Sequence, residues 1–169
     1  IKKKIKNFEI IICTGFESEK LNRYIRNKYK TINIRVVENQ GYDSSNSCES
    51  LRLCLNNTIN KNIVIIDGNL LFSKELLKLQ KKYKAYTYVQ RNNKTLEVGV
   101  NVNEDEDAEY FSFGASQQWC EVMFINDEAY IESLRKIVSN PELAKIILTL
   151  VHTNELVLAF PTSKAPPFI

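Results

Sequence analysis

The sequence contains few of the residues and motifs on which common catalytic and metal sites depend. Its 169 residues include one histidine, one tryptophan and four cysteines, and no two cysteines form a C-x-x-C pair. This inventory disfavours a structural zinc site. The P-loop motif G-x-x-x-x-G-K-[ST], the dinucleotide motif G-x-G-x-x-G and the nucleophile elbow G-x-S-x-G are also missing. The common phosphate-binding and hydrolase signatures therefore give no lead.

Long apolar runs and strong charge are also missing. No segment approaches a membrane span and no signal-peptide pattern occurs, so we expect a cytoplasmic protein with reduced thiols and no membrane partner. The net charge is only +3, and the lysines near the start and the acidic run at 104–107 are short. Short charged runs are usually solvated faces, so no nucleic-acid partner is expected.

The length and composition fit one globular domain, which we expect to cover residues 1–169. The first half alternates apolar strands with amphipathic helices, a pattern that predicts a doubly wound, mostly parallel sheet covered by helices. The strands are expected at 8–14, 31–37 and 62–66, and the helices at 17–28, at 47–59 and after Ser73.

The second half predicts a more antiparallel arrangement. Asn92-Asn93 lies between two strand patterns at 85–90 and 95–101, which is a hairpin-like signal. Two further strands, a helix capped by Asp127, a second helix and a final strand follow, at 109–114, 119–125, after 127, from 140 and at 155–160. The fold class is therefore mixed α/β.

The run NIVIIDGNLLF is the most informative segment, because a wholly apolar β-branched strand ends there in Asp67-Gly68-Asn69. Such a strand is typical of the middle of a covered parallel sheet, and ligands of open α/β sheets bind beyond the carboxyl ends of the strands. Two interpretations remain open. Asp67 and Asn69 either face a nucleotide phosphate or metal, or they only form an Asx turn.

A second candidate is the polar loop at 41–46, which leads into a helix that starts at Ser47. Hydroxyl and amide groups at a helix N-terminus suit hydrogen bonds to a base edge or an anion. The alternative is ordinary capping of the helix by Ser45 or Ser47, which we favour for any single residue.

Three segments together resemble the nucleotidyltransferases of the sugar-phosphate and phosphocholine type, which have a Rossmann-like fold. They are FEIIICTGFESEKLNRYI, VVENQGYDSSNSCESLRL and NIVIIDGNLLF. The resemblance is good over residues 8–72 and extends further only in the order of elements. It implies transfer of a nucleotidyl group, CMP or UMP, from CTP or UTP to a phosphorylated sugar or alcohol, with release of pyrophosphate. Mg²⁺ and basic groups would neutralise the phosphates.

By the same resemblance, Asn46 and Ser50 lie near the nucleotide base, and Asn69 occupies the position of a metal-binding aspartate. Asn69 offers only a neutral oxygen, so Asp67 would have to turn outward to compensate. The Gly-rich triphosphate loop that opens the family is not in the sequence, nor is a late second aspartate. We therefore expect a piece that is incomplete at both ends and that does not turn over as given.

Two expectations follow from these departures. The alternative function is a non-catalytic domain of the same fold that binds a nucleotide or a partner. A sheet without its first strand would also leave an open edge, so a homo-oligomer is expected.

Overall fold

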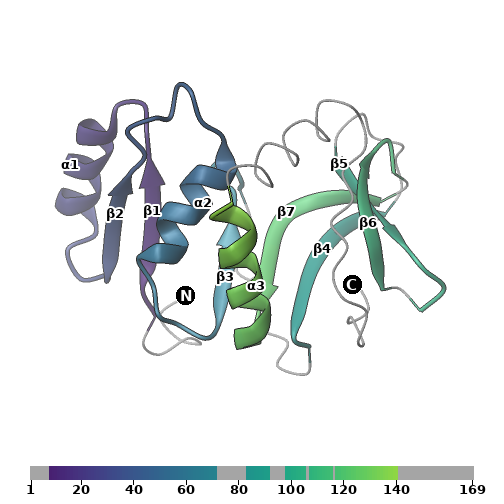
Figure 1. Ribbon diagram of the computed structural model, residues 1–169. Coiled ribbons are helices and arrows are strands. Elements are labelled where there is room, and N and C mark those ends of the chain that lie inside the picture. The colour runs from purple at the N-terminus through teal and green to yellow at the C-terminus, as the bar shows by residue number, and fades with distance from the viewer. Residues whose placement is uncertain (1–7, 72–82, 92–97, 106, 116, 141–169) are drawn as a thin grey trace. The chain divides into compact units, whose positions relative to one another are not determined.

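The computed structural model describes residues 8–71, 83–91, 98–105, 107–115 and 117–140, which form the helices and strands drawn in Figure 1. The chain divides into two compact units, residues 1–59 with 135–141, and residues 60–134 with 142–169. Each unit contains its own sheet. The elements are β1 (Ile10–Thr14), α1 (Ser18–Lys28), β2 (Ile34–Glu38), α2 (Ser47–Asn56), β3 (Ile63–Ile66), β4 (Ala85–Arg91), β5 (Val98–Val102), β6 (Ala108–Phe113), β7 (Gln117–Ile125) and α3 (Glu128–Val138).

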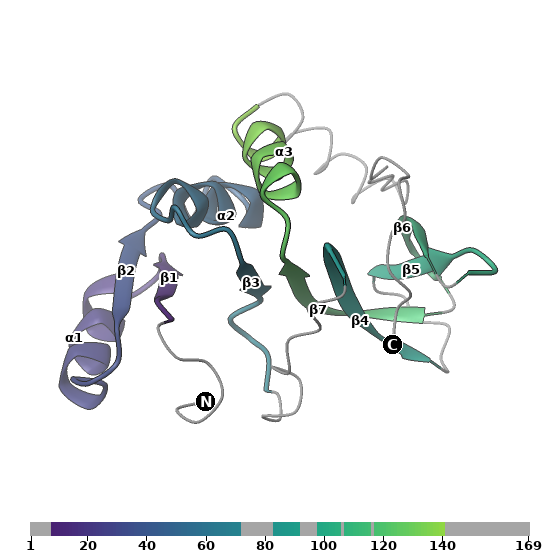
Figure 2. The same ribbon diagram turned by 90° about the horizontal axis from the view of Figure 1, so that it is seen from below.

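The first unit is built on a parallel pair of strands. β1 and β2 pair from Ile10 opposite Ile34 to Thr14 opposite Glu38, so both strands end at the same edge. Figure 2 shows α1 and α2 on opposite faces of this pair. Ile25 of α1 and Leu55 of α2 are buried, as expected where an amphipathic helix covers a sheet.

The second unit is built around the long strand β7, which pairs antiparallel with β3, β4 and β5, while β5 also pairs antiparallel with β6. Tyr86 of β4 stacks on Phe124 of β7, with ring centroids 4.5 Å apart. Trp119 of β7 packs edge-on against the buried Phe111, and its indole N–H donates to the Thr87 hydroxyl at 2.8 Å. Aromatic pairs from different strands therefore fill part of this core.

The helix α3 starts where the sequence predicted. The Asp127 carboxylate accepts hydrogen bonds from the Ala129 and Tyr130 backbone N–H groups, as in a regular N-cap. Further along, the Arg135 guanidinium donates to the carbonyls of Leu55 and Thr58 at the C-terminal end of α2. None of the described helices is long and apolar enough to cross a membrane.

The predicted mixed α/β class with an antiparallel second half is confirmed. The finer expectation of a mostly parallel sheet is not met by the described pairings, of which β1–β2 is the one parallel pair. The turn at Asn92-Asn93 lies outside the described residues, and among the described pairings β4 and β5 each pair with β7 instead of forming a hairpin. The predicted elements after residue 140 and after Ser73 lie outside the described residues.

Candidate functional site

The carboxyl ends of β1 and β2 carry two loops that touch each other in the first unit. Gly15 follows β1, and a Cβ there would lie 2.4 Å from the Cβ of Tyr42 in the loop after β2. Only glycine allows this approach. Below the contact, the Thr14 and Ser18 hydroxyls form a buried 2.9 Å hydrogen bond between the end of β1 and the start of α1. The two loops are therefore held against each other at one edge.

The buried Asn39 side chain holds the loop after β2 in place through hydrogen bonds. Asn39 is buried at 3% exposure, its Nδ2 donates to the hydroxyls of Ser45 and Ser50 at 2.9 and 3.2 Å, and its Oδ1 accepts from Gly41 N–H at 3.1 Å. Its backbone N–H also donates to the Thr14 carbonyl at 2.8 Å. The Asn39 side chain thus ties the loop to α2, and its backbone N–H ties it to β1.

Asn46 and Ser50, the predicted base contacts, both take part in this arrangement. Asn46 is the N-cap of α2, and its Oδ1 accepts from the N–H groups of Cys48 and Glu49 at 2.8 and 3.2 Å. The cap is therefore Asn46, not Ser45 or Ser47. The Asn46 amide nitrogen makes no hydrogen bond within the described residues and remains a donor toward solvent.

The start of α2 is a poor site for an anion. Two of its first N–H groups are already used by Asn46. Glu49 stands in the first turn in a two-point contact with Arg52, at 2.6 and 2.7 Å, and hydrogen bonding from Arg52 lowers the Glu49 pKa. The ionised Glu49 carboxylate already interacts favourably with the positive end of the helix dipole, so a bound anion would gain less there. Of the two ligands that the loop suits, the geometry favours a base edge.

Asp67 and Asn69 lie in the second unit, in the turn after β3, and both are exposed. The Asp67 Oδ1 accepts from the Asn69 backbone N–H at 3.2 Å, so the Asx turn that the sequence left open is present. The Asp67 N–H donates to the carbonyl of Glu121 on β7 at 3.2 Å. The turn is therefore anchored to a neighbouring strand through its backbone.

Glu121 marks an irregularity in β7. Its φ is 54°, in the left-handed region that favours glycine. The register of β7 against β4 shifts between Thr87 and Val89, which face Met123 and Trp119. β-Bulges of this kind are frequent beside active sites. The structure thus places a strained strand residue against the backbone of the candidate metal turn.

No family model matches the sequence, and no curated protein matches it. Among solved structures, HddC from Yersinia pseudotuberculosis aligns with a TM-score of 0.55 and 7% identity, over 74% of this chain and 58% of its own. HddC complexed with GMP-PN aligns with a TM-score of 0.54 and 8% identity, over 73% and 57%. The CTP:phosphocholine cytidylyltransferase LicC from Streptococcus pneumoniae aligns with a TM-score of 0.55 and 16% identity, over 93% of this chain and 71% of its own.

The chain has a nucleotidyltransferase-like fold. Identities this low show a shared fold and nothing finer, and the chain spans less than two thirds of the length of HddC. In the first unit, the loops after β1 and β2 follow the carboxyl ends of a parallel pair of strands, which is where α/β sheets bind their ligands.

Sequence reasoning did not identify three residues that lie in or beside the candidate site segments: Asn39, Phe16 and Glu121. Asn39 follows an expected strand, and no sequence signal indicates that α2 would bury its side chain. Phe16 precedes a helix and gave no sign that its ring is exposed. Glu121 lies inside an apolar strand pattern, where no sequence signal indicates a left-handed backbone.

Proposed function

We propose that this chain is the core of a nucleotidyltransferase that, in the complete protein, transfers CMP or UMP from CTP or UTP to a phosphorylated sugar or alcohol. The phosphate of the acceptor attacks the α-phosphorus, a new P–O bond forms, and pyrophosphate leaves. The observation that carries the proposal is the nucleotidyltransferase-like fold, in which the likeness to LicC extends over 93% of this chain. The order of the three segments noted in the sequence supports it independently.

Asn46 and Ser50 are proposed to meet the base. The Asn46 amide nitrogen is a donor toward solvent, and the Ser50 hydroxyl accepts from Asn39, which leaves its own proton to donate. Two donors at this position suit carbonyl oxygens on the edge of a pyrimidine.

Asp67 and Asn69 are proposed to hold Mg²⁺. Both offer oxygen donors on an exposed turn, and one Asp67 oxygen remains beyond the one used in the Asx turn. Mg²⁺ is commonly held by one or two carboxylates, with waters and substrate phosphates completing its shell, so this donor set fits. The metal would neutralise the charge of the triphosphate during transfer.

The alternative is a non-catalytic domain that binds a nucleotide or a partner. Asn69 favours it, because an amide in place of a carboxylate weakens the hold on a hard dication. The two functions differ in whether Mg²⁺ strengthens binding and in whether pyrophosphate is released.

The test is calorimetric titration of the four nucleoside triphosphates, with and without Mg²⁺, into the wild type and Asn69→Asp. We expect CTP or UTP to bind, and Asn69→Asp to bind more tightly only when Mg²⁺ is present. An equal affinity of the two proteins with Mg²⁺ would refute the metal assignment. A pyrophosphate-release assay on the complete protein, with phosphocholine and sugar phosphates as acceptors, then separates the enzyme from the binding domain.

Asn46→Asp is the matched variant for the base contact, because aspartate keeps the helix cap and removes the amide donor. We expect its stability to match the wild type and its affinity for CTP or UTP to fall. If Asn46→Asp and the wild type have equal affinity and equal stability, Asn46 only caps the helix and does not contact the base.

A further inference from the structure

Two aromatic rings stand exposed on the touching loops of the first unit. Phe16 follows Gly15 after β1 and is 77% exposed, and Tyr42 lies in the loop after β2 and is 48% exposed. Their ring centroids are 6.5 Å apart, at an interplanar angle of 64°. Leaving a phenylalanine ring this exposed gives up about 2 kcal/mol of the hydrophobic stabilisation that burial would provide. Such an exposed pair is therefore a candidate ligand contact.

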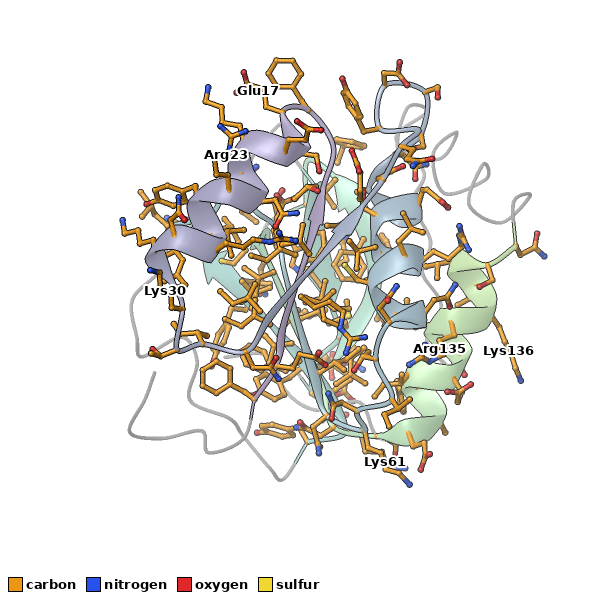
Figure 3. The ribbon with its side chains drawn as sticks, turned by 90° about the vertical axis from the view of Figure 1, so that its left-hand side faces the viewer. Glu17, Arg23, Lys30, Lys61, Arg135 and Lys136 are labelled. Atoms are coloured by element: carbon orange, nitrogen blue, oxygen red, sulfur yellow. The ribbon has the colours of Figure 1, made fainter. Side chains whose placement is uncertain are left out.

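The pair is fixed by the backbone beneath it. Tyr42 rests on Gly15, whose missing side chain makes room for it. Phe16 is followed by Glu17, which adopts a left-handed conformation with φ of 52° and starts α1 without a side-chain cap. Glu17 lies at the tip of the first unit in the turn that leads into α1 (Figure 3). The Thr14–Ser18 hydrogen bond links the two ends of this turn.

We propose that Phe16 and Tyr42 form an aromatic platform on which the nucleobase of the bound nucleotide stacks. The inference rests on the proposed function and adds the residues that hold the flat face of the base. The rings lie beyond the carboxyl ends of two parallel strands, where α/β sheets bind their ligands. Tyr42 stands on the same loop as Asn46, whose amide donor would meet the edge of the base.

A second exposed aromatic pair in the same unit shows what distinguishes the platform. Tyr24 of α1 and its C-cap Tyr29 also lie edge to face, but the Lys28 ammonium lies 5.0 and 5.8 Å from their ring centroids and donates to the Tyr24 hydroxyl at 2.5 Å. Hydrogen bonding from Lys28 lowers the Tyr24 pKa. Their ring faces are thus engaged by a cation, whereas no described cation lies over Phe16 or Tyr42.

The charges around the platform also favour a base over a phosphate. Glu17 is paired with Lys20 at 2.9 Å, so the turn carries no net positive charge, and Asp43 adds an exposed carboxylate next to Tyr42. An anion would be repelled here, while a neutral planar ring gains stacking.

The experiment compares three probes on three proteins. Dissociation constants for CTP or UTP, the matching nucleoside and inorganic tripolyphosphate are measured for the wild type, Phe16→Ala and Tyr24→Ala. Tyr24 is the control because its exposure, 49%, equals that of Tyr42 and its ring is engaged by Lys28. Phe16→Ala removes an exposed ring, so the fold is retained.

We expect Phe16→Ala to weaken the triphosphate and the nucleoside alike, about tenfold, and to leave tripolyphosphate unchanged. Tyr24→Ala should match the wild type. If the wild type binds the triphosphate and Phe16→Ala binds it equally well, the platform is refuted and the proposed function stands. If the wild type binds neither triphosphate nor nucleoside, both are refuted. If Phe16→Ala changes only self-association, measured by sedimentation, the rings belong to a protein contact and the platform is refuted.

Discussion

Replacing Asn39 by alanine removes the side chain that joins the loop after β2 to its surroundings. Three hydrogen bonds are lost, to Ser45, to Ser50 and from Gly41. At about 1 kcal/mol each they sum to about 3 kcal/mol. Ser45 is exposed and recovers part of its share from water, so we expect a loss of about 2 kcal/mol in the free energy of unfolding.

The measurement is urea unfolding followed by circular dichroism, with the melting temperature as a second readout. A loss of about 2 kcal/mol corresponds to a drop of about 4–8 °C for a chain of this size. Gln40→Ala is the matched control, because Gln40 is the next residue and is exposed. Its change should stay within about 0.5 kcal/mol.

Asn39→Asp tests the reasoning more closely. Aspartate still accepts from the Gly41 N–H, and the hydroxyls of Ser45 and Ser50 can rotate to donate to it. We therefore expect a loss smaller than that of alanine. If Asn39→Ala costs no more than Gln40→Ala, the buried amide does not hold the loop. If Asn39→Asp is the worse variant, the cost of burying a charge outweighs the hydrogen bonds.

Two further outcomes follow from the first unit. Arg135→Met should lower the free energy of unfolding by about 2–3 kcal/mol in urea titration, because the guanidinium donates to two carbonyls at the C-terminal end of α2. Lys136→Met alters the exposed neighbouring residue (Figure 3) and should change the free energy of unfolding little. Burial raises the pKa of the Cys54 thiol to about 11, with the neighbouring Cys13 adding to the shift. Because the unfolded thiol ionises first, stability should fall as the pH rises from about 9 to 11, and Cys54→Ala should reduce that fall in pH-dependent unfolding; an unchanged slope would contradict the shift.

Local patterns predicted the elements of the first unit well. The helix expected at 17–28 is α1, and the strands expected at 8–14 and 31–37 are β1 and β2, each displaced by a few residues. Periodicity and β-branched runs are properties of a short segment, so a sequence alone carries them. The mixed α/β class followed from the same signals.

Strand partners and buried polar groups were harder to predict, because they depend on distant parts of the chain. The apolar run at 63–66 predicted a strand in the middle of a covered parallel sheet, whereas β3 is only half-buried, with Val64 exposed, and its described neighbour, β7, is antiparallel. The turn signal at Asn92-Asn93 could not show that β4 and β5 both pair with β7, a strand that comes later in the sequence. The Asx turn at Asp67 is local and was one of the two interpretations that the sequence left open, whereas the burial of Asn39 needs β1 and α2 around it.

The two non-glycine residues with positive φ among the described residues, Glu17 and Glu121, both stand beside proposed ligand contacts. A left-handed backbone costs about 1–2 kcal/mol for such a residue, and glycine would relieve it while losing about 0.5–1 kcal/mol in chain entropy. Glu121→Gly should therefore stabilise the protein by about 0.5–1 kcal/mol in urea unfolding, whereas Glu121→Ala, which keeps the strain, should not. If both variants stabilise equally, the backbone is not the source. If Glu121→Gly gains stability but loses affinity for the triphosphate with Mg²⁺, the strain serves to position the Asp67 turn.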